Sequence, residues 1–326
     1  MRRREFIKVI AASAAAWPLA ARAQQAGAVA KIGILYPGPE EIAKLRSVPL
    51  LAGLGSEGLH EPDQITLLIR ATDGDAARIT PLLNELLASK VDLLIPSGPA
   101  VTRAVHAAAK SVPIVTIDLE SDPVETGWLQ SYAHPGGNLT GVFSDFPEFS
   151  TKWLELLKET VPGLANLVVL WDRTTPTVQT RAVTEAAQLV NVKAEVLSFK
   201  SPSDFGAVFD AASARHPDGL LFLSSPLVSI NSKHLAELAL QHRLPAISMF
   251  SSFVRTGGLI SYGPNVDDIW REMGVMAAKI LRGTKAADLP AERPTRFELF
   301  INVKTANTLG LTIPGTLLAR ADEVIE

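Results

Sequence analysis

The sequence predicts an α/β protein made of two doubly wound lobes, each a parallel sheet covered by helices, joined by a hinge that the chain crosses several times. The chain has 326 residues, 47% of them hydrophobic, which is enough for two domains of about 150 residues each. Short runs of β-branched and aliphatic residues alternate with longer segments rich in alanine and leucine. Such alternation is typical of strands and helices in parallel sheets.

Five strands and two helices are predicted in the first part of the chain. The strands are short apolar runs bounded by glycine, proline or polar residues, at 31–36, 64–70, 93–96, 114–117 and 138–142. In the helices, apolar residues recur every three or four positions, at 75–89 and 100–109. Each of these helices connects two strands, as parallel strands require.

The same alternation then repeats. Strands are predicted at 167–171, 193–197, 219–223, 246–249 and 259–262. Helices are predicted at 149–160, 177–189, 203–214 and 231–241. A further helix at 267–281 and a last strand at 298–303 follow. The repeat predicts a second sheet of the same kind as the first.

Three stretches look like crossings between the lobes. HPGGNLTGVFSDFPEFS, residues 134–150, has turn residues followed by a new amphipathic helix. GLISYGPNVDDIW and RPTRFELFIN look like two further crossings. We therefore expect one lobe to comprise residues 31–145 and 263–292, and the other to comprise 146–262 and 293–326. Several crossings form a hinge, and a hinge implies a ligand cleft.

The N-terminus has the features of a targeting signal. MRRREFIKVIAASAAAWPLAARAQQ begins with three arginines, continues with a modestly apolar run and reaches Ala21-Arg22-Ala23, a pattern that signal peptidases cut. RREFIK also resembles the twin-arginine export consensus. We expect a twin-arginine signal peptide at residues 1–23, cleaved after Ala23, and a periplasmic location. The apolar run is shorter than the roughly 20 residues of a membrane span, so we expect no stable membrane insertion.

Charge and motifs argue against several classes of protein. The formal net charge is −3, and no basic block follows the first residues, so no nucleic acid partner is expected. The chain has no cysteine and six scattered histidines, so no metal is expected. GLGSEG at 53–58 matches G-x-G-x-x-G but lies at the end of an apparent helix, not between a strand and a helix. We interpret it as helix-capping glycine and expect no cofactor.

Small and polar residues gather where the predicted strands end. In an open α/β sheet, ligands bind beyond the carboxyl ends of the strands, near helix N-termini with free N–H groups. The loops at such positions are SGPA at 97–100, ESDP at 120–123, WDR at 171–173, SSP at 224–226 and MFS at 249–251. Ser97 and Gly98 precede a helix, so they either hold a ligand carboxylate or form an ordinary N-cap.

One of these strand ends is strongly acidic. IVTIDLESDPV, residues 114–124, runs from an apolar strand into Asp118, Glu120 and Asp122. The three carboxylates could be catalytic acids, metal ligands, partners of a cationic ligand or solvated loop residues. A catalytic pair needs two carboxyls with separated pKa values on either side of a substrate bond, and the sequence offers no such evidence.

The chain also resembles a known family over nearly its whole length. The resemblance is carried by KIGIL, PSGPAVTRAVHAA, VPIVTIDLESDPVETG, HPGGNLTGV, WLELLKETVPG, LPAIS, GGLISYGPN and above all AAKILRGTKAADLPAERPTRFELFINVKTANTLGLTIP. These segments resemble the substrate-binding proteins of ABC transporters of the tryptophan- and tyrosine-binding type, with the type I periplasmic-binding-protein fold. The segment YPGPEEIAKLRSVPLLAGLGSEGL departs from the family, whose members usually have a Gly/Ser-rich stretch and a long helix there.

The resemblance implies ligand contacts from both lobes. They are Tyr36, Ser97, Gly98, Pro99, Ala100, Ser121, Asp122, Asp172, Ser224, Ser225, Pro226, Phe250 and Tyr262. Asp122 would pair with a ligand ammonium through a charge-assisted hydrogen bond, or else cap the helix after Pro123. Asp118 and Glu120 are interpreted as solvated or hinge residues. Trp171, Phe250 and Tyr262 either stack on an apolar part of the ligand or fill the core.

These observations predict a periplasmic solute-binding protein of an ABC importer, with no enzymatic activity of its own. It would bind an amino acid or a small organic or aromatic acid between its lobes and deliver it to a permease in the inner membrane. We expect it to act as a monomer. Two alternatives stay open. A ligand sensor for a signalling receptor would have the same fold, and the twin-arginine route commonly carries secreted cofactor-dependent enzymes.

Overall fold

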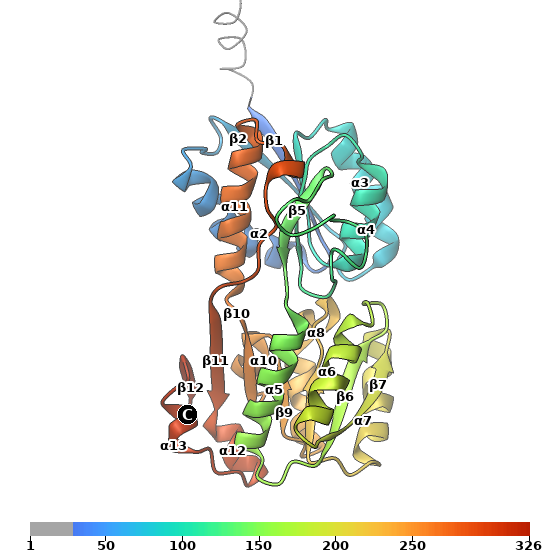
Figure 1. Ribbon diagram of the computed structural model, residues 1–326, viewed down its shortest axis with the longest axis vertical. Coiled ribbons are helices and arrows are strands. Elements are labelled where there is room, and N and C mark those ends of the chain that lie inside the picture. Colours follow the sequence, from blue (N-terminus) through green and yellow to red (C-terminus); the bar gives the residue numbers. More distant parts are fainter. Residues whose placement is uncertain (1–28) are drawn as a thin grey trace, which may run out of the picture.

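The computed structural model describes residues 29–326 and consists of two α/β lobes stacked along the long axis of the molecule (Figure 1). The predicted signal peptide, residues 1–23, lies outside the described residues. Each lobe is a largely parallel sheet with helices on both faces. The predicted fold class is therefore confirmed.

Lobe 1, the upper lobe in Figure 1, contains a five-stranded sheet. Its strands are β1 (Ala30–Tyr36), β2 (Ile65–Ala71), β3 (Leu93–Pro96), β4 (Ile114–Asp118) and β5 (Leu139–Phe143). They pair in the order β2-β1-β3-β4-β5, and every neighbouring pair is parallel. Its helices are α2 (Glu40–Ser56) and α11 (Val266–Leu281) on one face, and η1 (Ala76–Arg78), α3 (Ile79–Ala88) and α4 (Pro99–Ala108) on the other.

Helix α2 occupies the segment whose sequence departs from the family. It is 17 residues long despite Pro49 in its interior, which costs one backbone hydrogen bond. Glu40 and Glu41 lie in its first turn, where they interact favourably with the helix dipole. Gly58, with a φ of 73°, follows the C-cap of α2, as the capping interpretation predicts.

Gly53 has a different role, which the sequence pattern did not predict. It lies inside α2, where α2 and α11 touch backbone to backbone. A methyl group at Gly53 would overlap the carbonyl oxygen of Arg271, and one at Gly274 would overlap the carbonyl oxygen of Leu50. Only glycine lets two helix backbones approach this closely. The contact holds the two helices side by side on one face of lobe 1.

Lobe 2 contains a seven-stranded sheet in the order β12-β11-β10-β9-β8-β6-β7. Its strands are β6 (Asn166–Asp172), β7 (Lys193–Phe199), β8 (Gly219–Phe222), β9 (Ala246–Ser248), β10 (Ile260–Pro264), β11 (Phe297–Asn302) and β12 (Glu323–Ile325). Strand β11 is antiparallel to β10, and the other neighbouring pairs are parallel. The longer helices are α5 (Phe146–Thr160), α6 (Val178–Leu189), α7 (Phe205–Ser213) and α9 (Ser232–Gln241).

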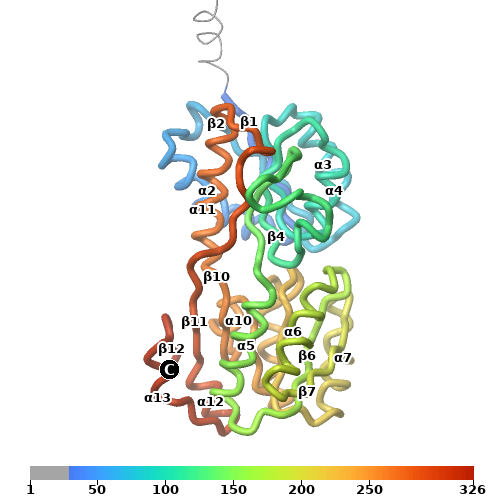
Figure 2. Tube along the Cα trace, in the orientation of Figure 1, coloured from blue at the N-terminus to red at the C-terminus, as the bar shows by residue number. Residues whose placement is uncertain are grey.

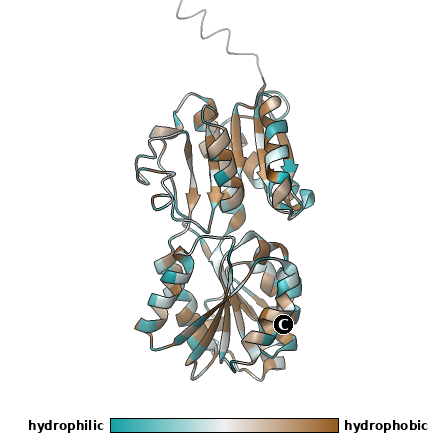
Figure 3. Cartoon of the chain, turned by 90° about the vertical axis from the view of Figure 1, so that its right-hand side faces the viewer, coloured by the Kyte–Doolittle hydropathy of each residue, from teal (hydrophilic) through white to brown (hydrophobic). Residues whose placement is uncertain are grey.

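Several short elements of lobe 2 were absent from the sequence prediction. They are α8 (Pro226–Ile230), α10 (Ser251–Arg255), α12 (Val303–Leu309), α13 (Gly315–Leu318) and β12, whereas η2 (Pro202–Asp204) and α7 together correspond to the helix predicted at 203–214. Segments of this length are too short to show a clear hydrophobic period. Apolar residues otherwise concentrate on the strands and the inner sides of the helices (Figure 3). No helix of residues 29–326 combines the length and apolar character needed to cross a membrane.

The chain passes between the lobes three times (Figure 2). The crossings run from β5 to α5, from β10 to α11, and from η3 (Ala286–Asp288) to β11. The backbone N–H of Phe143 donates to the carbonyl oxygen of Glu292 at 3.0 Å, which joins the first and third crossings. The β10–β11 pairing joins the second and third. The three crossings thus lie side by side as one hinge.

Candidate functional site

Loops from both lobes meet in a cleft beside the hinge. The loops that follow β1, β3 and β4 face those that follow β6, β8 and β9, and two adjoining cavities lie between them. We call the first, of about 60 Å³, the Arg46 cavity, and the second, of about 200 Å³, the Lys200 cavity. Each is named after a basic residue in its lining.

The two lobes approach each other closely at two glycines of lobe 1. A Cβ atom at Gly98 of lobe 1 would lie 2.9 Å from Cγ of Pro226 in lobe 2. A Cβ atom at Gly38 would lie 2.9 Å from Cδ1 of Ile230, also in lobe 2. Pro226 and Ile230 line both cavities. The absence of side chains at the two glycines is what lets helix α8 approach lobe 1.

Most of the residues predicted to contact the ligand lie in this cleft. Those that line one or both cavities are Tyr36, Ser97, Gly98, Pro99, Ala100, Asp172, Pro226 and Phe250. Ser121, Ser224 and Ser225 are fully buried next to them. Ser97 is not an N-cap, because Gly98 occupies that position of α4 and no side chain caps the helix. The helix N-terminus beside Ser97 therefore keeps N–H groups for a ligand.

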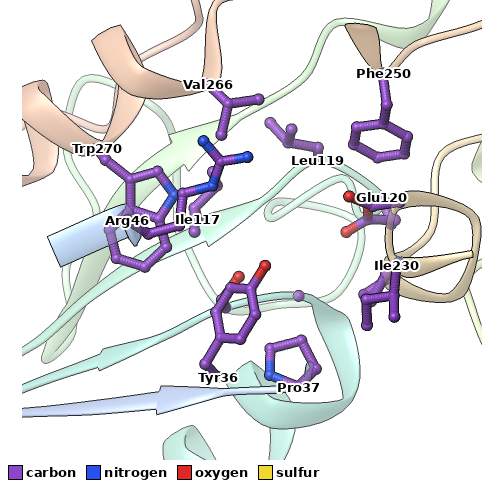
Figure 4. A pocket seen from close by; sticks show the side chains of 14 residues that line it. Tyr36, Pro37, Arg46, Ile117, Leu119, Glu120, Ile230, Phe250, Val266 and Trp270 are labelled. Atoms are coloured by element: carbon purple, nitrogen blue, oxygen red, sulfur yellow. The ribbon is translucent and has the colours of Figure 1, made fainter. Parts of the chain in front are cut away.

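The acidic strand end is buried beside the Arg46 cavity. Asp118 is 0% exposed and Glu120 is 4% exposed, so the interpretation of these two as solvated residues is wrong. Oδ1 of Asp118 accepts hydrogen bonds from the backbone N–H groups of Glu120 and Ser121, both at 3.0 Å. This local turn folds the chain back after β4 and turns the side chain of Glu120 into the Arg46 cavity (Figure 4).

Glu120 also makes a hydrogen bond across the cleft. The hydroxyl of Ser224 in lobe 2 donates to Oε1 of Glu120 at 2.7 Å. The amide of Gln179 fixes the Ser224 backbone, since it donates to the Ser224 carbonyl and accepts from its N–H, both at 2.9 Å. Gln179 is 1% exposed. Gln179 was not predicted from the sequence, because a glutamine in a helix carries no signal of such a role.

Asp122 lies away from these contacts. Its Oδ1 accepts hydrogen bonds from the backbone N–H groups of Val124, at 2.8 Å, and Glu125, at 3.0 Å. It lines neither the Arg46 cavity nor the Lys200 cavity. Of the two roles left open from the sequence, these hydrogen bonds correspond to the cap, here of the turn after Pro123.

A third carboxylate approaches from lobe 2. Asp172, at the end of β6, is 1% exposed and lines the Lys200 cavity. Its Oδ1 accepts from the backbone N–H of Thr174 at 2.9 Å and from its hydroxyl at 2.7 Å, while Oδ2 has no hydrogen-bond partner in the described chain. Oδ2 of Asp118 is likewise without a partner there. None of Asp118, Glu120 and Asp172 forms an ion pair with any residue of 29–326.

The three carboxyl groups hold their protons more strongly than exposed ones do. Burial raises the pKa of Asp118 and of Asp172. The pKa of Glu120 is raised well above its ordinary value, first by burial and then by the charge of Asp118, with a further contribution from the charge of Asp172. Acidic side chains of both lobes therefore repel one another in the closed cleft when they are ionised.

This raised pKa predicts a pH dependence of stability. The folded state binds the proton of Glu120 more tightly than the unfolded chain, so its contribution to stability is fully present below the ordinary pKa of 4.5 and is lost as pH rises through the raised value. We expect wild-type protein without ligand to lose stability relative to Glu120→Gln as the pH rises from the ordinary pKa of 4.5 through the raised one. Urea unfolding of both proteins across this range measures the difference. A difference that stays constant with pH would contradict a raised pKa.

The far end of the Arg46 cavity is cationic and aromatic. The guanidinium of Arg46, in α2, pairs with Asp267 at 2.7 Å. Tyr36 and Trp270 lie beside it with ring centroids 6.4 Å apart (Figure 4). Burial raises the pKa of Tyr36, and the charge of Arg46 opposes this in part. Arg46 and Trp270 were not predicted from the sequence, because each lies within a helix, in α2 and α11, and not in a strand-end loop.

Tyr262 lies outside the cleft. Its ring packs against Phe297 and Phe149 beside the hinge and lines a different cavity, not the two between the lobes. Within residues 29–326, no group of three or more histidine, aspartate or glutamate side chains is arranged to hold a metal ion.

Comparisons with known proteins agree with this architecture. Residues 43–325 match the family model described as ABC transporter substrate binding protein. A tyrosine-binding protein of Clostridioides difficile (strain R20291) is 23% identical over 269 residues, which cover 80% of this chain and 75% of that protein.

Two solved structures show the same fold. The ABC domain from Streptococcus pneumonia in complex with L-Trp has a TM-score of 0.84 and 22% identity, covering 91% of this chain and 100% of its own. A solute binding protein from R. palustris in complex with benzoate has a TM-score of 0.58 and 13% identity, and the match covers 78% of this chain and 79% of that protein. The resemblance noted in the sequence is thereby confirmed. Because the family model spans most of the chain, this chain belongs to the ABC transporter substrate-binding protein family.

Proposed function

We propose that the protein is the exported solute-binding component of an ABC importer, and that it closes on an amino acid between its lobes. The observation that supports this most is the group formed by Asp118, Glu120 and Asp172, buried where the lobes meet and unpaired with any cation of the described chain. Buried like charges are unfavourable unless they are neutralised. A ligand ammonium among them would relieve the repulsion and favour the closed state.

Glu120 is the carboxylate that we assign to the ammonium. Its side chain lines the Arg46 cavity, and only one of its oxygens accepts the Ser224 hydroxyl. Asp122 already accepts two backbone N–H groups on the outside of the cleft. Ammonium binding would also lower the pKa of Glu120, because an opposite charge favours the ionised form.

The other parts of an amino acid have matching surroundings. Ser97 and the N-terminus of α4 offer a hydroxyl and free N–H groups to the carboxylate. Tyr36, Trp270 and Phe250 offer an apolar wall to the side chain. A small organic or aromatic acid without an amine would use both of these contacts but would leave the buried carboxylates unpaired. An amino acid therefore fits better than a simple acid.

The family supports the transport role. Its members are substrate-binding proteins of ABC transporters, and relatives named above bind tyrosine, L-Trp and benzoate. Delivery from the periplasm to an inner-membrane permease, after export with the signal at residues 1–23, is part of our proposal. A sensor for a signalling receptor is the alternative that shares this fold and cleft, and the secreted cofactor-dependent enzyme is the other.

Thermal unfolding with a panel of candidate ligands tests the proposal. A ligand at about 1,000 times its dissociation constant adds about 4 kcal/mol to the free energy of unfolding, which raises the melting temperature by several degrees. We expect such a shift with amino acids, and none with their decarboxylated amines or their deaminated acids. Shifts with acids alone would contradict the assignment of Glu120. An absorbance spectrum with a flavin or metal chromophore would support the enzyme alternative instead.

A further inference from the structure

Tyr262 lines a cavity that lies outside the cleft proposed to bind the amino acid. This cavity, of about 310 Å³, lies beside the hinge and is lined by Glu148, Phe149, Thr151, Lys152, Glu155, Tyr262 and Phe297. We call it the hinge cavity. None of these residues lines the two cleft cavities. Its size falls at the lower end of the range of small-molecule sites.

Three aromatic rings form the walls of the hinge cavity. Tyr262 and Phe297 are stacked, with centroids 5.9 Å apart and ring planes inclined by 24°. Phe149 meets the edge of Phe297 at 5.1 Å and lies 6.4 Å from Tyr262. The rings come from α5, β10 and β11, one beside each of the three crossings. Aromatic rings attract cations through their faces and apolar groups through burial.

The rim of the hinge cavity is negative. Lys152 is paired with Glu155 at 3.1 Å, which cancels one positive against one negative charge. Glu148 has no ion pair with any residue of the described chain. Its charge also acts on the cavity wall, because the pKa of Tyr262 is raised first by burial and then by Glu148. The lining therefore carries a net negative charge beside three aromatic rings.

We propose that the hinge cavity binds a small organic cation with an apolar or aromatic body, separately from the amino acid in the cleft. The body would pack against Phe297 and Tyr262, and the cationic group would lie beside Glu148 and over the rings. The combination of aromatic faces and an unpaired carboxylate favours a cation over an anion of the same size. This site is independent of the identity of the transported ligand.

Isothermal titration of the purified protein with benzyltrimethylammonium chloride at low ionic strength tests the proposal. We expect one site, no detectable binding of 3-phenylpropionate, and about fivefold weaker cation binding in Glu148→Gln. Phe297→Leu is expected to weaken cation binding by about tenfold, because it removes an aromatic face. Glu185→Gln removes an exposed carboxylate elsewhere in lobe 2 and is expected to leave cation binding unchanged.

Glu120→Gln distinguishes the hinge cavity from the cleft. We expect that variant to bind benzyltrimethylammonium as the wild type does. Loss of cation binding in Glu120→Gln but not in Glu148→Gln would place the cation in the cleft and overturn the proposal. Absence of binding to the wild-type protein, or equal binding to 3-phenylpropionate, would overturn it as well. Glu148 is exposed, so its substitution tests the site even if Phe297→Leu fails to fold.

Discussion

Replacing Glu120 by glutamine is expected to weaken amino acid binding by about 100-fold or more, because a buried ammonium would lose its ionised partner. Glutamine keeps the shape of the side chain and still accepts the hydrogen bond from Ser224. The variant should therefore fold. It should also be at least as stable as the wild type without ligand, because the repulsion with Asp118 is removed.

Isothermal titration with the amino acid identified in the ligand panel measures this effect. Asp122→Asn is the matched control, because it removes one carboxylate charge two residues away while asparagine preserves the cap. We expect the affinity of Asp122→Asn to stay within about threefold of wild type. If Asp122→Asn loses affinity and Glu120→Gln keeps it, the ammonium belongs to Asp122, as the sequence first suggested.

Replacing Gly274 by alanine is expected to lower the free energy of unfolding by about 3 kcal/mol or more. Alanine is the better helix former by about 1 kcal/mol, but its methyl group would overlap the carbonyl oxygen of Leu50. That atom is backbone, so α2 and α11 must move apart. Gly53→Ala should act in the same way, through the carbonyl oxygen of Arg271.

Thermal and urea unfolding followed by circular dichroism measure this loss. Gly206→Ala is the control, because Gly206 is also helical and exposed and no atom lies within 4 Å of a Cβ built there. We expect Gly206→Ala to be neutral or to stabilise the protein by up to about 1 kcal/mol. Equal effects of Gly274→Ala and Gly206→Ala would show that α2 and α11 separate without cost.

The helix contact also has a consequence for the cleft. Arg46 lies on α2 and Trp270 on α11, and both line the same cavity. The glycine contact therefore sets the separation of a cation and an aromatic ring at the candidate site. A variant that forces the helices apart would change the cavity even if the lobe stays folded.

Local patterns were sufficient for the regular elements. Strands such as 93–96 and 167–171 are apolar runs, and the structure has strands there. The loops expected to contact a ligand at 97–100 and 224–226 do meet in the cleft. Both results follow from a rule that holds for any open parallel sheet, in which loops at the carboxyl ends of the strands share one edge.

The two α/β lobes and the edge at which their loops meet could be predicted from the sequence, because hydrophobic period and turn residues are local properties of the chain. The tertiary structure determines which carboxylate faces the cleft, since the hydrogen bonds of Asp118 turn Glu120 inward and those of Asp122 keep Asp122 outside. It also brought Arg46, Trp270 and Gln179 to the cleft from helices. Burial and partner choice depend on residues distant in the chain, and these set the charge state of each acid.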